Sequence, residues 1–398
     1  MALNLTDTAG QIDGMASELK ARQSDQERRI LSALRGIEDF QTQDGEGSSG
    51  ESDGFGWAVP VVLEPPGSAF PPSELPADFT VASVDGSQID ADRHLAARCF
   101  LINTGVSVLT YGSRPDADLS SRPRLYAQSD ELVIRDPATY REQAIEGAVL
   151  GAKRTVEEIR GLVDVVSKLP EETPTLALMD GSLLMLGLVG RGYDDFVRQE
   201  LVDDGFAAAL EDLREISEAR PVAVASHISL PRHFEVVNAL RPTVCELADG
   251  PCGSASLGRQ SCDRCVDGVL DREIYGRLLQ PGERSGLFMT SSSFVEDHYR
   301  GQRICFFYVN VGAEICRVEV PSWVVENEAL LGLVHTLVVD QCERGRGYPV
   351  GLMEAHEQAV VSGRDRQMFV QLVERALYDE NLPVFTSEKD RSKRLRWL

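Results

Sequence analysis

The stretch LALMDGSLLML, residues 176–186, places an aspartate inside a run of apolar residues. The residues before Asp180 are continuously apolar, which is typical of a strand buried at the centre of a sheet. Asp180 stands where this strand leaves the core and is followed by Gly181 and Ser182. Asp and Gly are ordinary turn formers, so this triplet alone indicates only the end of a strand.

The chain repeats this pattern earlier, in FTVASVDGSQ at residues 79–88, where Asp85 ends another apolar run. Between the two triplets, residues 93–113 predict one or two strands broken at an Asn103-Thr104-Gly105 turn, and residues 131–136 predict a further strand. Residues 138–170 predict a long helix that ends at Pro170.

The order of these elements is strand with acid, antiparallel strands, helix with acids, and strand with acid. This order matches a ribonuclease-H-like α/β fold, a mixed sheet flanked by helices, in which the two acid-bearing strands lie side by side. A helix packed across them would bring a third carboxylate to the same place. Carboxylates held together repel one another unless a cation binds them, and oxygen ligands favour Mg²⁺ or Mn²⁺.

The third acid must come from the predicted helix. Glu158 shares a helical face with the apolar Leu162 and Val165, and also with Arg154, whereas Glu157 and Glu146 are expected on the solvated surface. The candidates that the spacing leaves open are Glu142, Glu146, Glu157 and Glu158. The hydroxyls or the backbone amides of Ser87 and Ser182 are expected to brace the two aspartates, since neither serine lies in a nucleophile elbow.

We predict three regions along the chain. Residues 1–40 form an N-terminal amphipathic helical segment, and residues 41–77, rich in Gly, Ser, Pro and acids, form an irregular linker. Residues 78–398 form the main domain, interrupted by a cysteine-rich insertion at 241–270.

The charge of the chain limits its possible functions. A formal net charge of −23 over 398 residues argues against a passive nucleic-acid binder, because such proteins gain affinity by neutralising phosphates. An enzyme with a local basic track is compatible with this charge, and the C-terminal KDRSKRLRWL is locally basic. No apolar run approaches the roughly 20 residues of a membrane helix, and no secretory signal is evident, so we expect a cytoplasmic protein.

Four of the eight cysteines cluster within CELADGPCGSASLGRQSCDRC, as Cys245, Cys252, Cys262 and Cys265. Four thiolates at such spacing predict a structural Zn²⁺ site or an iron–sulfur cluster, although the spacing fits neither standard template. The remaining cysteines are expected to be buried as small hydrophobic residues.

The two Asp-Gly-Ser strands, together with GYPVGLMEAHEQAVVSGRDRQMF near the C-terminus, resemble the NurA nuclease family. The resemblance implies a Mn²⁺- or Mg²⁺-dependent deoxyribonuclease with Asp85, Glu158 and Asp180 as metal ligands. It further implies Tyr348 and His356 as site residues, His356 acting as a ligand or a proton-transfer group. Weaker similarity suggests DNA-backbone contacts near Glu283 and Arg284 and near Lys389.

The resemblance also implies a 5′-to-3′ exonuclease and single-strand endonuclease that processes DNA ends. It implies a homodimer that works with HerA, a hexameric ATPase that translocates DNA, and leaves open whether the role is repair or defence. Two other classes stay in view, a non-catalytic regulatory subunit of such a translocase and an actin-like phosphotransferase. Mn²⁺-dependent degradation of single-stranded DNA, lost on substitution of Asp85, separates all three.

Overall fold

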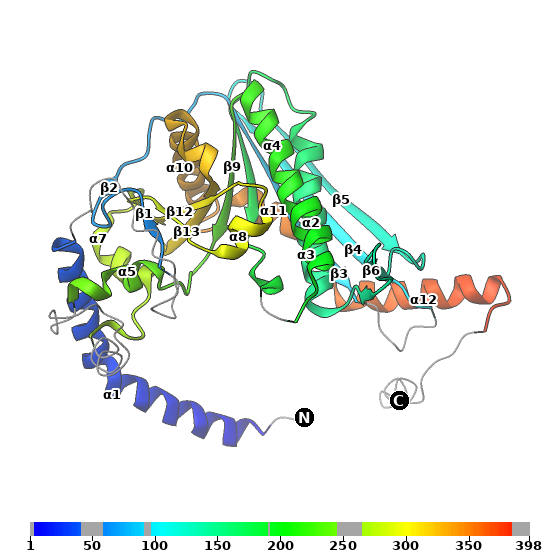
Figure 1. Cartoon of the computed structure of the whole chain (residues 1–398), viewed down its shortest axis with the longest axis horizontal. Helices are drawn as coiled ribbons and strands as arrows, with labels where there is room; N and C mark the ends of the chain where they lie inside the picture. Colours follow the sequence, from blue (N-terminus) through cyan, green and yellow to red (C-terminus); the bar gives the residue numbers. More distant parts are fainter. Residues whose placement is uncertain (1–3, 41–58, 91–96, 190–191, 245–264, 384–398) are drawn as a thin grey trace. The chain divides into compact units, whose positions relative to one another are not determined.

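The computed structural model describes residues 4–40, 59–90, 97–189, 192–244 and 265–383. The chain divides into two compact units, which are described separately. The sheet unit comprises residues 72–228, 293–304 and 318–398, and the small unit comprises residues 1–71, 229–292 and 305–317. Figure 1 traces the chain through both. Among the described residues, no helix has the length and hydropathy needed to cross a membrane.

The described residues of the sheet unit include five long strands. They are β3 (Phe79–Ile89), β4 (Phe100–Tyr111), β5 (Asp116–Tyr126), β8 (Thr175–Asp180) and β9 (Val222–Ile228). Their spatial order is β9-β8-β3-β4-β5, with β3, β4 and β5 antiparallel in sequence and β3, β8 and β9 mutually parallel. This is the ribonuclease-H-like arrangement, so the predicted fold class is confirmed.

Strand β4 runs without interruption through Asn103-Thr104-Gly105, and the predicted turn there is wrong. Gly105 pairs with Asp85 in the ladder, and a Cβ at this glycine would lie 2.1 Å from the carbonyl oxygen of Ala355. The glycine therefore serves the close approach of a helix to the strand. Sequence patterns missed β5 altogether, because its Asp, Ser and Pro residues are mostly exposed at a sheet edge.

The predicted long helix is shorter than expected. Residues Glu142–Ala144 form β7, which pairs with β6 (Val133–Arg135) in a separate two-stranded sheet, and α2 spans Gly147–Val166. A second helical run consists of α3 (Asp195–Arg198), a π-helical segment (Gln199–Ala207) and α4 (Ala208–Ala219). Glu142 is thus a strand residue, paired with Arg135 at 2.8 Å, and is no longer a candidate from the helix.

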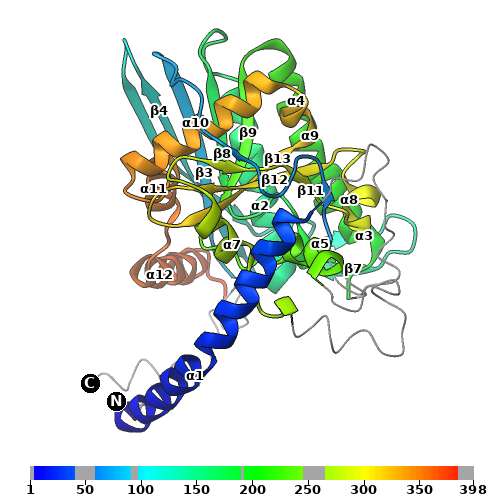
Figure 2. The same cartoon turned by 90° about the vertical axis from the view of Figure 1, so that its left-hand side faces the viewer.

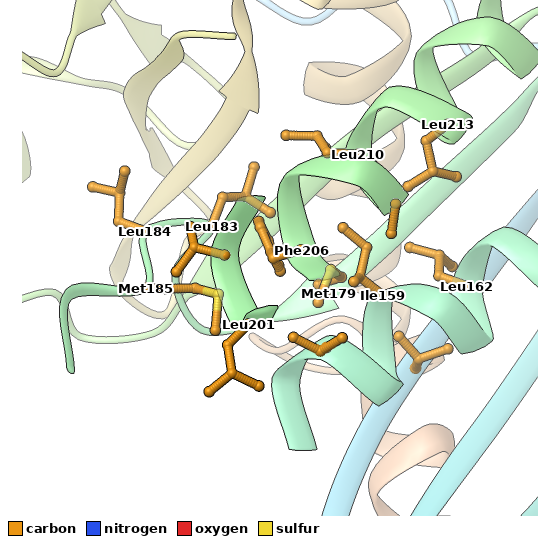
Figure 3. Close-up of a cluster of buried hydrophobic side chains, with 14 of the residues drawn as sticks. Ile159, Leu162, Met179, Leu183, Leu184, Met185, Leu201, Phe206, Leu210 and Leu213 are labelled. Carbon is orange, nitrogen blue, oxygen red and sulfur yellow. The ribbon is translucent and has the colours of Figure 1, made fainter. Parts of the chain in front are cut away.

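Helices α2 and α4 pack on one face of the strands through a large apolar core (Figure 3). Ile159 and Leu162 of α2 are fully buried beside Met179 of β8 and Phe206 of the π-helical segment. Burying an aliphatic side chain of this size contributes about 1.5–3 kcal/mol, so these contacts fix how α2 is rotated on the sheet. That rotation sets the position of Glu158, which directly precedes Ile159.

The opposite face carries α10 (Glu328–Arg344) and α11 (Val350–Ala359), as Figure 2 shows. Short helices α8 (Ser293–His298) and α9 (Ser322–Val325) and the C-terminal α12 (Gly363–Asp379) complete the described part of the sheet unit. Side chains alternate along β3: Ala82 and Val84 belong to the core under α2, whereas Val81 and Ser83 lie next to Gly351 of α11.

The small unit is built around α1 (Leu5–Glu38), α5 (Glu235–Val244) and α7 (Asp271–Leu278). Ile30, Ala33 and Ile37 of α1 pack with Val237 and Leu240 of α5 in an apolar cluster. Short strands pair nearby: β1 (Val61–Val62) with β11 (Phe288–Met289), and β2 (Ala69–Phe70) with β10 (Arg284–Ser285). Strand β12 (Ile304–Asn310) pairs with β10 and β11, and the chain re-enters the sheet unit along β13 (Ile315–Pro321). The predicted domain boundaries stay a prediction.

Candidate active site

The two aspartates lie at adjacent ends of neighbouring parallel strands. Val84 of β3 is opposite Met179 of β8, so Asp85 and Asp180 occupy the next step of the same ladder. Side chains at matched positions of parallel strands point to the same face, here the face that carries α11. The carboxylates affect each other, since the charge of Asp85 contributes to the raised pKa of Asp180, after the larger effect of desolvation.

Glu158 reaches the aspartates from α2, on the other face of the sheet. A Cβ at Gly86 would lie 2.3 Å from Oε1 of Glu158 and 2.9 Å from Cγ of Arg154. The absence of a side chain at residue 86 therefore leaves the space that the helix carboxylate occupies. The Asp-Gly order in this triplet has a direct structural reason. The side chain of Asp85 points to the face of the sheet that carries α11, and Gly86 leaves space on the α2 face for the carboxylate of Glu158.

Burial and neighbouring charges make Glu158 the most perturbed acid of this site. It is 7% exposed, and desolvation raises its pKa to about 7, against the lowering effect of Arg154 and with further raising by Asp85 and Asp180. Glu157 instead pairs with Lys153 at 3.1 Å, and Glu146 pairs with Arg98 at 3.2 Å. Of the helix acids considered from sequence, the structure brings Glu158 to the aspartates.

Tyr348, just before α11, donates a hydrogen bond from its hydroxyl to Oδ1 of Asp180 at 2.8 Å. Desolvation, followed by the charge of Asp180, raises the pKa of Tyr348, so the phenol stays protonated and acts as a donor. His227 at the end of β9 packs edge-on against this ring, with centroids 5.2 Å apart. Burial lowers the pKa of His227 to about 4, so it is a neutral support for Tyr348.

His356 lies in the last turn of α11, not at its start, and its Nδ1 is 2.7 Å from Oδ2 of Asp85. The rest of the ring faces solvent. The end of α11 is anchored on the strands: Nδ2 of Asn103 and the hydroxyl of Ser87 both donate to the carbonyl of Ala359. With Gly105 beneath it, this anchoring holds His356 over Asp85.

The turn after Asp180 is braced by a different residue. The hydroxyl of Ser182 and the backbone N–H of Leu183 both donate to Oε2 of Glu319, at 2.7 and 2.9 Å. Glu319 lies on β13 and is fully buried. Tyr299 continues the support by donating from its hydroxyl to the carbonyl of Leu183. Both serine hydroxyls therefore act through hydrogen bonds that hold the segments after the aspartates.

The residues present fit a divalent cation. Asp85, Glu158 and Asp180 offer the hard oxygen ligands that Mg²⁺ and Mn²⁺ prefer, and Oε1 of Glu158 is buried without a hydrogen-bond partner. Each acid has its own neighbour: His356 for Asp85, Tyr348 for Asp180 and Arg154 for Glu158. Within the described ranges, no group of three or more His, Cys, Asp and Glu side chains forms a ready-made metal site.

Several other predicted contacts fall elsewhere. Cys245, Cys252 and Cys262 and the basic residues after 383 lie outside the described residues, so the structural metal and the basic track stay predictions. Cys265 is half-buried against the apolar cluster of α1, α5 and α7.

The predicted DNA contact at Arg284 is wrong, because its guanidinium is buried, 2.8 Å from Glu64 and stacked over Phe70.

Cys99, Cys305, Cys316 and Cys342 are all buried, as predicted. Sequence patterns did not identify Glu319, His227 or Gly105 as parts of the site. Glu319 gave a usable signal, a lone acid within the apolar strand ICRVEVP. His227 gave another, a polar residue at the tip of the next parallel strand, in register with Asp180.

Solved structures with similar chains include three of interest. The NurA nuclease from Sulfolobus solfataricus is 14% identical, with 93% of this chain and 98% of that chain covered at a TM-score of 0.45. NurA bound to dAMP and manganese is 13% identical, with 95% and 97% covered at a TM-score of 0.36. LC9-RNase H1, a type 1 RNase H with the type 2 active-site motif, is 9% identical, with 42% and 71% covered at a TM-score of 0.21.

No curated protein sequence matches the chain. The family comparison is decisive, because the NurA domain model matches residues 79–361, a range that holds all five predicted site residues from Asp85 to His356. The match extends over most of the 398 residues. The chain therefore belongs to the NurA nuclease family.

Proposed function

We propose that this chain is a Mn²⁺- or Mg²⁺-dependent deoxyribonuclease whose metal ligands are Asp85, Glu158 and Asp180. The observation that carries the proposal is the convergence of three carboxylates from β3, α2 and β8. Burial raises the pKa of Glu158 to about 7, and the charges of Asp85 and Asp180 raise it further. Such mutual repulsion costs stability in the metal-free protein and is relieved when a cation binds. Membership of the NurA family supports the same activity.

Divalent cations, when bound, supply the Lewis acidity that activates water and stabilises the leaving oxygen of a phosphodiester. Tyr348 keeps the Asp180 carboxylate oriented through its hydroxyl. His356, with a proton on Nδ1, donates to Asp85 and presents Nε2 to solvent, where it can accept a proton during hydrolysis. Because Nδ1 is engaged by Asp85, a ligand role for His356 would have to use Nε2.

The test is Mn²⁺-dependent degradation of a labelled single-stranded oligonucleotide. Asp85→Asn and Asp180→Asn should each lower the cleavage rate by more than about a hundredfold, because each removes a ligand charge. Glu157→Gln is the matched control, since its acid neighbours Glu158 in sequence but pairs with Lys153, and it should retain activity. Cleavage by Asp85→Asn at the wild-type rate would refute the proposal.

The finer activities and the motor partner follow from the family resemblance. The chain is proposed to degrade DNA from 5′ ends, to cut single strands internally, and to act with a HerA-type hexameric ATPase. The net charge of −23 suits a nuclease that relies on a motor for most of its grip on DNA. Oligonucleotides labelled at either end test the polarity. Co-purification with the ATPase, and faster duplex degradation when ATP is present, test the partnership.

A homodimer is proposed to form through the first half of α1. Leu5, Ile12 and Leu19 recur every seven residues and are exposed, whereas the later residues of α1 pack within the small unit. A stripe of this spacing suits pairing with a second copy of the same helix. Ile12→Glu with Leu19→Glu should convert a dimer to a monomer in light scattering, and a dimer that survives the double substitution would exclude this surface.

The non-catalytic alternative makes a separate prediction. A regulatory subunit would stimulate the ATPase of a HerA-type partner, while no divalent cation would support cleavage by the chain itself. The filled acidic positions Asp85, Glu158 and Asp180 favour the enzyme over this reading.

A further inference from the structure

Arg154 lies one helical turn before Glu158 on α2, with Nε 3.0 Å from Oε1 of the glutamate. The two side chains are unequally exposed, 37% for Arg154 and 9% for Glu158. The arginine thus lies at the open side of the acid cluster, while the glutamate is inside. The stem of Arg154 crosses Gly86, next to Asp85.

The contact between Arg154 and Glu158 is a short ion pair that lowers the pKa of Glu158 against the larger effect of desolvation. Nε of Arg154 and Oε1 of Glu158 are both buried atoms, and within the described part of the chain neither makes a well-aligned hydrogen bond to any other group. An exposed i,i+4 pair formed only for helix stability contributes little and would not require a buried partner. Here the arginine offsets part of the electrostatic cost of a carboxylate held beside two others.

The neighbouring cations of α2 are already engaged elsewhere. Lys153 and Arg160 both lie near Glu157, at 3.1 and 3.7 Å. Arg154 is the cation of this helix that faces the acid cluster. A guanidinium remains charged at all physiological pH values and binds phosphate oxygens through two parallel N–H donors.

We propose that Arg154 is a substrate-positioning residue that has two successive partners. It neutralises Glu158 while no divalent cation is bound, and it contacts a phosphate of the DNA strand once Glu158 binds the cation. The inference rests on the proposed nuclease function and adds a residue that recognises the substrate backbone. No covalent step is involved, since Arg154 exchanges one anionic partner for another.

The exchange predicts opposite effects of one substitution. Arg154→Met keeps an unbranched, flexible stem and removes the charge, so Glu158 becomes available to the cation without competition. Mn²⁺ affinity measured by calorimetry without DNA should increase about threefold to tenfold. In the same variant, KM for a single-stranded oligonucleotide should rise about tenfold, and the salt dependence of DNA binding should weaken by about one phosphate contact.

Arg154→Lys and Arg160→Met complete the experiment. Arg154→Lys keeps the charge and loses the paired donors, so Mn²⁺ affinity should stay near wild type while KM rises. Arg160→Met removes a cation from the same helix at Glu157, and both quantities should stay near wild type.

An active Arg154→Met enzyme with unchanged Mn²⁺ affinity and unchanged KM would overturn this inference and leave the nuclease proposal intact. Weaker Mn²⁺ binding in Arg154→Met would also overturn it, because that result indicates a purely structural arginine. Arg154→Lys keeps the fold and the charge, so comparing its Mn²⁺ affinity with that of Arg154→Met checks this outcome. Absence of cleavage by the wild-type protein would instead refute the proposed function, and calorimetry would still report on the competition for Glu158.

Discussion

The triplets at residues 85–87 and 180–182 have the same three amino acids, but their glycines have different purposes. Gly86 continues a regular strand and leaves room for the carboxylate of Glu158, which a Cβ would meet at 2.3 Å. Gly181 has open space around it and a φ of +80°, a left-handed conformation that suits glycine. One glycine is required by a neighbouring side chain and the other by its own backbone.

The serines differ in the same way. Ser87 shares the carbonyl of Ala359 with Asn103, so α11 keeps one anchor if the serine is lost. Ser182 donates to Glu319, a buried carboxylate that would lose a donor. Identical sequence motifs can thus be supported by a helix end in one place and by a buried acid in another, and each support can be removed separately.

The largest expected effect is on stability and concerns Glu158, whose carboxylate occupies the space next to Gly86 of the first triplet. Its pKa is raised from 4.5 to about 7, so the folded protein binds more protons than the unfolded chain between these values, and stability falls as pH rises through this window. With metal removed by chelation, Glu158→Gln should be more stable than wild type by up to roughly 3 kcal/mol at pH 8 and similar to it near pH 4.5. Denaturant unfolding across this pH range measures the difference, and a difference independent of pH would contradict the prediction.

Gly86→Ala should displace Glu158 and Arg154, whose atoms lie 2.3 and 2.9 Å from the added Cβ. Because both are flexible side chains, the fold should survive while Mn²⁺ affinity falls about tenfold to a hundredfold. Calorimetry with Mn²⁺ measures this. Gly151→Ala, a substitution within α2 itself at a glycine with open space around it, is the control and should leave Mn²⁺ affinity unchanged.

Substituting the two serines should lower the free energy of unfolding by different amounts. Ser182→Ala leaves buried Glu319 with one donor fewer and should cost about 2 kcal/mol, since hydrogen bonds to charged groups are strong. Ser87→Ala leaves the carbonyl of Ala359 bonded to Asn103 and should cost about 1 kcal/mol or less. Equal costs in chemical denaturation would show that the two braces are equivalent.

The smallest effect is expected at Gly181. Gly181→Ala meets no atom within 4 Å but must adopt a positive φ, which costs about 1 kcal/mol. Stability should fall by this amount while Mn²⁺ affinity stays within about twofold of wild type. A large loss of Mn²⁺ affinity here would mean that the second glycine, like the first, shapes the site directly.

The sequence by itself determined the order of acid-bearing strands and helix, and with it the fold class. Apolar strands ending at Asp85 and Asp180 are a local pattern, and strand order follows because parallel neighbours need a helical crossover such as α2. Helical periodicity also favoured Glu158 over Glu157 and Glu146. It could not fix the start of α2 or detect the polar edge strand β5, since neither depends on a clear apolar repeat.

Only the tertiary structure decided which groups support those acids. Gly105 reads as a turn in sequence and is a strand residue because α11 presses against it. The sequence does not distinguish Arg154 from the other basic residues of the chain. Packing of Ile159 and Leu162 sets the rotation of α2, so that this arginine lies beside the acid cluster. Glu319 braces the second triplet from 137 residues away. Such contacts join residues far apart in the chain, and no local spacing encodes them.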